Sequence, residues 1–565
     1  MHDKADPSLA AGGKEETDTA KPPAGVQPAE PSAATQPGAA AEPRGRALSA
    51  TEPPAAVQPD TAAEPRGRAR AARVSRVAIA TVRHHWLVSA LLAAGLVLRV
   101  LTQIAYRPAL IYVDTLKYLY GASPGADPLG YRLVLKAILV FGDLGAVAAI
   151  QHLLGLAMAV ALYVVLLRRG APRWLAALAV APVLLDAYQL QMEQMAMPDV
   201  WFEAMIVAGL AVLLWRPVAS VPFAVVAGLI LGSSATLRQV GELLILPAVI
   251  FLLASGGGWR RAITSSVALT VAFALPILGY MGISDVRTGH FWLARGQSSI
   301  GRMAYAADCA TLKLPAPARS LCPTPAEQAN GPDWLEHSGK SPLFATPVQD
   351  RQKWLADLST AVKTQQPARV VVSILRDSVR LFALTRDGVQ SVTPISRWQF
   401  QTHYPTAPPW VSVNHKNDII VGVQPRAFKA FKLSKLKPAY GGKAHVDRPV
   451  ASFLRSYQLD GGYTPGPLLA LCILAGVAAS LLVLLRRKTG FRSRQLALGS
   501  LLFTVAVAAV LVLPDILEFS WRYQLPAVII LPPAGALGIA ALVAGRRFTR
   551  QSQAEGATEA EPSQA

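Results

Sequence analysis

Residues 144–170 read LGAVAAIQHLLGLAMAVALYVVLLRRG, a long apolar run closed by Arg168, Arg169 and Gly170. As a helix, a run of about 20 apolar residues is long enough to cross the ~30 Å hydrocarbon core of a bilayer. Arginines directly after such a run are typical of a loop that stays in the cytoplasm. The stretch therefore predicts a membrane-spanning helix with a cytoplasmic C-terminal end.

The same pattern recurs along the chain. The predicted spans are 86–104, 144–167, 174–190, 200–215, 218–237, 243–255, 262–283, 467–485, 496–513 and 524–544. Arginine-rich loops alternate with arginine-poor loops between them, as the positive-inside rule requires. The apolar segment 131–141 is too short to cross and carries Arg132 and Lys136 one helical turn apart, which favours an interfacial helix. We predict an all-α polytopic membrane protein with about ten transmembrane helices.

The composition supports this class. The chain has 565 residues, of which 52% are hydrophobic and 16% charged, with a formal net charge of +20. In a soluble protein this charge would indicate nucleic-acid binding. Here the arginines gather in short loops between apolar runs and set orientation in the bilayer, so we expect no nucleic-acid partner.

The spans divide the chain into five parts. Residues 1–76, rich in Ala, Pro, Glu and Gly, predict a disordered cytoplasmic tail. Residues 77–283 and 467–545 form the two transmembrane parts, and 546–565 a second disordered cytoplasmic tail. Between the transmembrane parts, 284–466 predicts a smaller extracytoplasmic insert of mixed structure. The first apolar run begins far into the chain, so no cleavable signal peptide is expected. The predicted location is the cell membrane, with both termini cytoplasmic.

The three cysteines fall into two groups. Cys309 and Cys322 lie close together in the insert and predict a disulfide on the oxidising side, with two free thiols as the alternative. Cys472 lies in an apolar run and reads as a small core residue. No His or Cys spacing indicates a metal site; the sequence leaves use of a divalent metal open.

The predicted outer loops hold the candidate functional residues. Residues 106–119, YRPALIYVDTLKYL, place Asp114 with Lys117 and Tyr118 just past the first span. A carboxylate near hydrocarbon is costly, which favours a functional role for Asp114. The later outer loops add Glu193, Asp199, Arg238, Arg522 and Tyr523.

These residue types suit one class of chemistry. A carboxylate can take the proton of an acceptor hydroxyl, and arginines can bind the phosphate of a lipid-linked donor. We therefore predict inverting sugar transfer from a polyprenyl-phosphate donor to a cell-envelope acceptor, with Asp114 catalytic. Donor or acceptor binding is predicted for Lys117, Tyr118, Glu193, Asp199, Arg238, Arg522 and Tyr523. The alternatives are that the aromatic residues are interfacial anchors and that Asp127 and Asp186 cap helices.

The layout resembles the GT-C fold of membrane glycosyltransferases that use polyprenyl-phosphate sugars, including protein mannosyltransferases and lipid A aminoarabinose transferases. The resemblance covers about 86–544 and rests on Asp114, the stretch 151–155 (QHLLG), the loop 193–199 and the motif 521–526 (WRYQLP). It implies that Asp114 takes the place of the family's aspartate in the first outer loop. Many members carry Asp-Glu there, whereas here Thr115 follows Asp114, which leaves the subgroup and the use of a metal open.

Two other functions were weighed. A transporter or flippase for a lipid or small solute tends to show internal repeats with broken spans in matching halves, and the sequence shows no such symmetry. A non-catalytic membrane scaffold would use the polar insert to bind a cell-wall partner.

Overall fold

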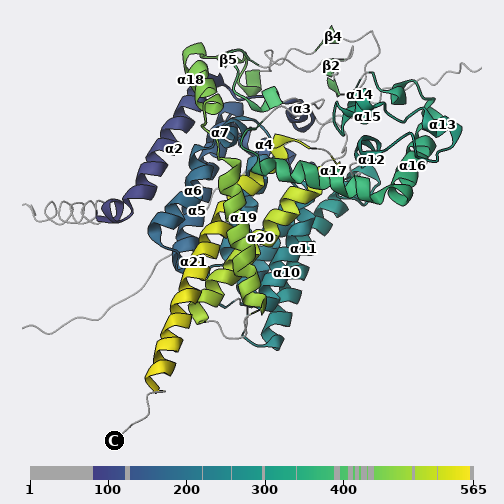
Figure 1. Cartoon of the computed structure of the whole chain (residues 1–565). Coiled ribbons are helices and arrows are strands. Elements are labelled where there is room, and N and C mark those ends of the chain that lie inside the picture. Colours follow the sequence, from purple (N-terminus) through teal and green to yellow (C-terminus); the bar gives the residue numbers. More distant parts are fainter. Residues whose placement is uncertain are drawn as a thin grey trace, which may run out of the picture. The chain divides into compact units, whose positions relative to one another are not determined.

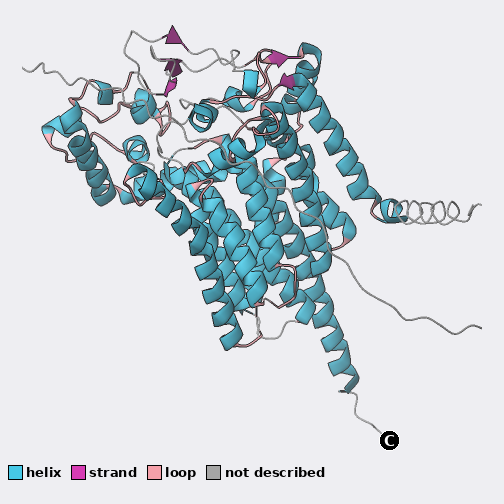
Figure 2. Cartoon of the chain, turned by 180° about the vertical axis from the view of Figure 1, so that it is seen from behind, coloured by secondary structure: helices cyan, strands magenta, loops and turns pink. Residues whose placement is uncertain are grey.

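The computed structural model describes residues 80–120, 128–218, 220–255, 257–294, 299–338, 340–386, 395–404, 411–413, 419–421, 429–430, 438–485, 490–517 and 519–559. The predicted disordered tail, 1–76, and the predicted cap Asp127 lie outside these residues. The described part is largely helical, with a few short strands near one end of the bundle (Figure 2). The predicted fold class, an all-α polytopic membrane protein, is confirmed.

Every predicted span corresponds to helix in the structure (Figure 1). The bundle consists of α2 (Trp86–Ala105), α5 (Leu144–Arg169), α6 (Arg173–Leu185), α7 (Ala187–Gln194), α8 (Asp199–Leu213), α9 (Val221–Ala235), η1 (Gln239–Leu244), α10 (Ile245–Ala254), α11 (Trp259–Thr288), α19 (Gly466–Leu485), α20 (Phe491–Leu517) and α21 (Trp521–Glu559). Among the described residues, five helices are each long and apolar enough to cross a membrane, or six with the bent pair α6–α7. The count of about ten spans stays a prediction.

Two spans differ from the sequence prediction. The third span is broken, because the Asp186 carboxylate accepts a hydrogen bond from the Tyr188 backbone N–H and so begins α7, which is bent by 50° from α6. Asp186 is thus a helix cap, one of the two roles considered for it. The last span was expected to end near Ala544, but α21 continues to Glu559 and extends helix into the predicted tail 546–565.

Contacts between the arginine-rich loops show that these loops lie together. Arg169, at the end of α5, donates to the Leu214 and Arg216 carbonyls and to the Gln495 side chain. Arg492 donates to the Gly170 carbonyl. Loops predicted to lie on the cytoplasmic side therefore meet at one end of the bundle. Which side of the membrane that end faces stays a prediction.

Close helix packing holds the bundle together. Lipid is as apolar as a leucine side chain, so helices in a membrane associate through tight contacts between small residues. In α9, Gly228 and Gly232 are one turn apart and face α11. A Cβ on Gly228 would lie 2.5 Å from the Leu269 carbonyl oxygen, and one on Gly232 would collide with that of Phe273. These two positions require glycine for the observed approach.

The remaining elements gather at the other end of the bundle, with the insert. They are β1 (Tyr106–Arg107), α3 (Val113–Tyr120), α4 (Gly130–Ile138), α12 (Ile300–Ala306), α13 (Ala316–Arg319), α14 (Pro325–Gln328), α15 (Trp334–His337), η2 (Pro342–Phe344), α16 (Val348–Gln365), α17 (Pro367–Val379), η3 (Arg380–Phe382), η4 (Ile395–Trp398), β2 (Val411–Val413), β3 (Ile419–Val421), β4 (Lys429–Ala430), η5 (Pro438–Tyr440), β5 (His445–Val446) and α18 (Arg448–Leu459).

The strands form two small antiparallel sheets. β1 pairs with β5, matching Tyr106 with Val446, and the other sheet has the order β3-β2-β4. The segment 131–141, predicted to be an interfacial helix, forms the short helix α4. In the insert, the Sγ atoms of Cys309 and Cys322 are 2.02 Å apart, in the geometry of the disulfide that the sequence predicts.

Candidate functional site

The loop that carries Asp114 is fixed to the loop after α7. The Leu110 N–H donates to the Gln194 carbonyl at 2.9 Å, and the Ala196 N–H donates back to the Leu110 carbonyl at 3.0 Å. The Thr115 hydroxyl is fully buried and donates to the Ala196 carbonyl at 2.9 Å. Thr115, the departure from the family's Asp-Glu pair, thus holds the start of α3 in place.

Five of the predicted site residues form one ion cluster. Arg522 Nη1 lies 2.8 Å from Asp114 Oδ2, and Lys117 Nζ lies 3.6 Å from Asp114 Oδ1. Asp199 Oδ1 is 2.6 Å from Arg238 Nη1 and 3.3 Å from Arg522 Nε. The last contact is an ion pair by distance but not an aligned hydrogen bond. Among the described residues, three cations and two carboxylates make up this cluster.

The cluster is accessible on one side only. The side chains of Arg522 and Asp199 are each 5% exposed, whereas those of Asp114 and Lys117 are 24% and 21% exposed. The second oxygen of Asp199, Oδ2, is buried and has no hydrogen-bond partner among the described residues. A solute would therefore meet Asp114 and Lys117 first.

Aromatic rings surround the buried arginine. The Arg522 guanidinium lies 4.9 Å from the Tyr523 ring, 5.5 Å from Trp398 and 5.8 Å from Tyr112. The Arg238 guanidinium lies 4.8 Å from the same Tyr523 ring. Such cation–π contacts hold guanidinium groups in fixed positions while leaving N–H donors for a ligand. Trp398 belongs to the insert, so the insert reaches the cluster.

The charges around Asp114 control its proton affinity. Burial acts to raise the pKa of this carboxyl, but Lys117 and Arg522 outweigh it and hold the pKa well below its usual range. Asp114 is therefore ionised at every physiological pH. A carboxylate held this firmly by cations is a weak base until one of them is drawn away.

Tyr118, another predicted site residue, packs inward beside the cluster. Its side chain is buried, and its ring meets that of Tyr131 edge to face at 5.2 Å. The Tyr131 hydroxyl donates to Gln151 Oε1 at 3.0 Å, and Lys117 Nζ lies 5.2 Å from the Tyr118 ring centre. Tyr118 thus supports the position of Lys117.

Glu193 lies apart from the cluster, in a buried network. It is fully buried, 2.7 Å from Arg99 Nη2 and 2.9 Å from His152 Nδ1. His152 Nε2 faces Gln194 Oε1 at 2.8 Å, and Gln151 donates to the backbone carbonyl of Glu193. The stretch QHLLG therefore holds the loop after α7, which in turn holds the loop of Asp114.

Several of these residues are not among those predicted from the sequence. Arg99 lies inside the first predicted span, and a lone arginine in an apolar run is a signal that could have found it. Tyr112 and Trp398 were given no role, because aromatic residues suit a small core equally well. Asp515 is fully buried and accepts a hydrogen bond from the Ser378 hydroxyl at 2.8 Å. It also accepts one at 3.1 Å from the side chain of Gln524, which follows Arg522 by two residues.

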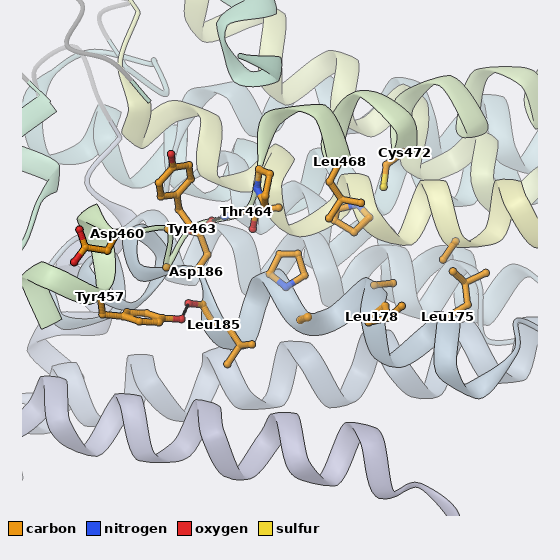
Figure 3. A pocket seen from close by; sticks show the side chains of 18 of the residues that line it. Leu175, Leu178, Leu185, Asp186, Tyr457, Asp460, Tyr463, Thr464, Leu468 and Cys472 are labelled. Atoms are coloured by element: carbon orange, nitrogen blue, oxygen red, sulfur yellow. Dashed lines mark hydrogen bonds between the residues drawn. The ribbon is translucent and has the colours of Figure 1, made fainter. Parts of the chain in front are cut away.

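An apolar groove lies between the membrane helices and α18. It has a volume of about 730 Å³ and lies between α6, α18, α19 and α21 (Figure 3). Leu175, Leu178 and Cys472 line one end, whereas Asp186, Tyr463 and Thr464 line the other. The groove does not contain the ion cluster itself.

One arginine lies between the polar end of the groove and the start of α21. Arg386 Nη2 lies 2.8 Å from Asp186 Oδ2, at the polar end of the groove. The Arg386 guanidinium also lies 5.9 Å from the ring of Trp521, the residue before Arg522. The polar end of the groove is therefore adjacent to the start of α21.

The use of a metal stays open. Among the residues described, no three His, Cys, Asp or Glu side chains come together as metal ligands. The two carboxylates of the cluster, Asp114 and Asp199, are each held by an arginine.

No family model and no curated protein sequence matches the chain, but solved structures do. The Pmt1-Pmt2 protein O-mannosyltransferase complex of S. cerevisiae, bound to the sugar donor, is 15% identical, with a TM-score of 0.29 over 38% of this chain and 36% of that one. The oligosaccharyltransferase AglB of Archaeoglobus fulgidus, in complex with an inhibitory peptide and a dolichol-phosphate, is 12% identical, with a TM-score of 0.34 over 86% of this chain and 53% of that one.

A third match is ArnT from Cupriavidus metallidurans bound to undecaprenyl phosphate, 14% identical, with a TM-score of 0.28 over 81% of this chain and 78% of that one. This chain spans about half or less of the length of the first two proteins. At these identities and TM-scores no residue role transfers from them. All three are membrane glycosyltransferases of the class that the sequence motifs resemble.

Proposed function

We propose that this chain is a membrane glycosyltransferase that moves a sugar, with inversion, from a polyprenyl-phosphate donor to a cell-envelope acceptor outside the cytoplasm. The observation that carries the proposal is the 2.8 Å ion pair between Asp114 and Arg522. It joins a base to a phosphate-binding group across 408 residues of sequence. The two arginines and the lysine gathered in the cluster suit an anionic ligand.

The donor phosphate binds to the arginines. A guanidinium offers paired N–H donors that match phosphate oxygens and stays charged at any relevant pH. Arg522 and Arg238 lie on either side of Asp199, which holds both of them in place. Lys117, at the exposed edge of the cluster, adds a third positive charge along the path of entry.

Asp114 acts as the general base. It takes the proton of the acceptor hydroxyl while that oxygen attacks the anomeric carbon from the face opposite the phosphate. The bond from this carbon to the phosphate oxygen breaks, and the polyprenyl phosphate leaves with the electron pair, held by Arg522 and Arg238.

The groove suits the isoprenoid tail of the donor. It is lined mainly by apolar side chains of three membrane helices, and its polar end adjoins the start of α21. In this arrangement the tail lies along α6, α19 and α21, and the phosphate reaches Arg522. With the arginine-rich loops in the cytoplasm, the cluster and the insert 284–466 lie outside.

The test compares Asp114→Asn with the parent in cells. Loss of a general base lowers the rate by about 10²- to 10⁴-fold. The variant should therefore accumulate the polyprenyl-phosphate sugar, and the envelope glycan should lack one sugar type. Asp285→Asn is the matched control, because Asp285 is exposed on α11 and its carboxylate forms no ion pair with the described residues. A normal donor pool and glycan in Asp114→Asn would remove the proposal.

A second variant separates binding from chemistry. Arg522→Lys keeps the charge but loses the planar pair of donors, so the purified protein should bind polyprenyl phosphate more weakly. A transporter for the same lipid would also lose binding. If the chain were a transporter, a different enzyme would transfer the sugar. Detergent extracts of Asp114→Asn cells supplied with donor and envelope acceptor would then keep sugar transfer, because no membrane barrier is present there.

A further inference from the structure

Helix α17 of the insert turns an apolar face outward. Val371, Val372, Leu375 and Val379 are each 52–60% exposed, and their spacing places them on one side of the helix. The opposite side is buried and includes Val370, Ser373, Asp377 and Ser378. A water-soluble domain has little reason to expose four large apolar side chains in one stripe.

The charges of α17 lie beside this stripe. Arg376 is exposed and has no ion pair among the described residues, and the Arg369 side chain is 56% exposed. The one carboxylate of the helix, Asp377, is buried against Arg302 at 2.6 Å. The charged side chains that α17 itself exposes are therefore both cations, and one of them, Arg369, lies 3.8 Å from Asp308. This is the pattern of a helix that lies in the interface of a membrane with anionic headgroups.

The contacts of α17 place its C-terminal end at the membrane boundary. The Ser378 hydroxyl bonds Asp515 near the end of α20. The following turn, η3, packs on Gly466, the first residue of α19, where an added Cβ would lie 2.5 Å from the Phe382 carbonyl carbon. α19 starts and α20 ends at this level, so α17 lies where the membrane surface begins. Figure 1 shows it running across the bundle helices rather than along them.

We propose that α17 is embedded in the leaflet on the insert side, with its apolar stripe among acyl chains and Arg376 at the lipid phosphates. The occupant of this face is the phospholipid surface around the bundle, because α17 ends beside the start of α19, which itself exposes Leu471 and Leu474 along its length. The insert is then not a freely projecting domain. One of its helices is part of the membrane-contacting surface, and this holds whatever reaction the cluster catalyses.

The test is spin-label accessibility in the full chain, in nanodiscs containing anionic phospholipid. Single cysteines replace Leu375 or Val372 in a Cys472→Ala background, with the Cys309–Cys322 pair left oxidised. Leu474→Cys on α19 is the lipid-facing reference and Lys363→Cys, exposed on α16, the water-facing one. Labels at 372 and 375 should collide more with oxygen than with a water-soluble nickel chelate, as at 474, with the reverse order at 363.

Two results would overturn the proposal. A label at 375 that behaves like the one at 363 would show that the stripe faces water. Low collision with both reagents would show that protein covers it. Dilution with unlabelled chain would then identify a second copy as the cover if spin–spin broadening disappeared. The two label positions are both exposed, so folding does not depend on either side chain.

Discussion

Replacing Gly155 by alanine tests the buried network that supports the site. Gly155 lies in α5, directly against the ion pair of Glu193 and Arg99. A Cβ at this position would collide with Glu193 Oε1 and lie 2.6 Å from Arg99 Nη2. Both side chains are buried, so neither can move away from the added Cβ into solvent.

The expected change in the free energy of unfolding combines one stabilising and two destabilising effects. Alanine is favoured over glycine inside a helix by about 1 kcal/mol. Forcing extra volume into a packed site costs about 1–3 kcal/mol. Separating a buried ion pair costs a further 3–5 kcal/mol or so. The net expectation for Gly155→Ala is a loss of about 3–7 kcal/mol in the free energy of unfolding.

The assay is thermal unfolding of the detergent-purified full chain, followed by size-exclusion chromatography after heating. Gly155→Ala should lower the apparent Tm by about 5 °C or more. Gly279→Ala in α11 is the matched control, since a Cβ there meets nothing within 4 Å, and it should leave the Tm unchanged or slightly raised. If the two variants were equally stable, Glu193 and Arg99 would not be packed as the structure has them.

Three further predictions address charge, redox state and sidedness. Lys117→Gln removes a cation that lowers the pKa of Asp114, so this pKa should rise. Asp114 is then protonated at a higher pH, and the acidic limb of the pH–rate profile should move to higher pH. An unchanged limb would mean that another group titrates. Cys309 and Cys322 should resist alkylation in non-reduced protein, and removing the bond should cost the insert up to about 3 kcal/mol; two free thiols would contradict this. A cysteine at Ser338 should react with an impermeant reagent in intact cells, and reaction only after permeabilisation would reverse the topology.

The helices of the bundle were predictable where the sequence has a long apolar run. Each apolar run became helix, and the loops with arginines met at one end of the bundle, because length and charge alone decide these features in a membrane. The break at Asp186 was harder to see. A capping carboxylate and a bend depend on the hydrogen bond to Tyr188 and on the partner Arg386, which lies 200 residues away.

The site was predictable in its members more than in its arrangement. Asp114, Lys117, Asp199, Arg238 and Arg522 do come together, as expected for outer loops on the same side. Their pairing was not predictable, since it depends on how α3, α8 and α21 pack. For the same reason Glu193, in the same outer loop as Asp199, joins the buried network: α7 turns its side chain toward α2 and α5.

The proposed mechanism makes donor binding and base strength interdependent. At rest, Arg522 is shared between two carboxylates and keeps Asp114 a weak base. A donor phosphate bound to Arg522 competes with Asp114 for the same guanidinium and brings its own negative charge near the carboxylate. Both effects raise the proton affinity of Asp114, since a nearby negative charge disfavours a second one. Asp114 then becomes an effective base only when the sugar donor is in place, and the unloaded enzyme does not abstract protons from acceptors that reach the site first.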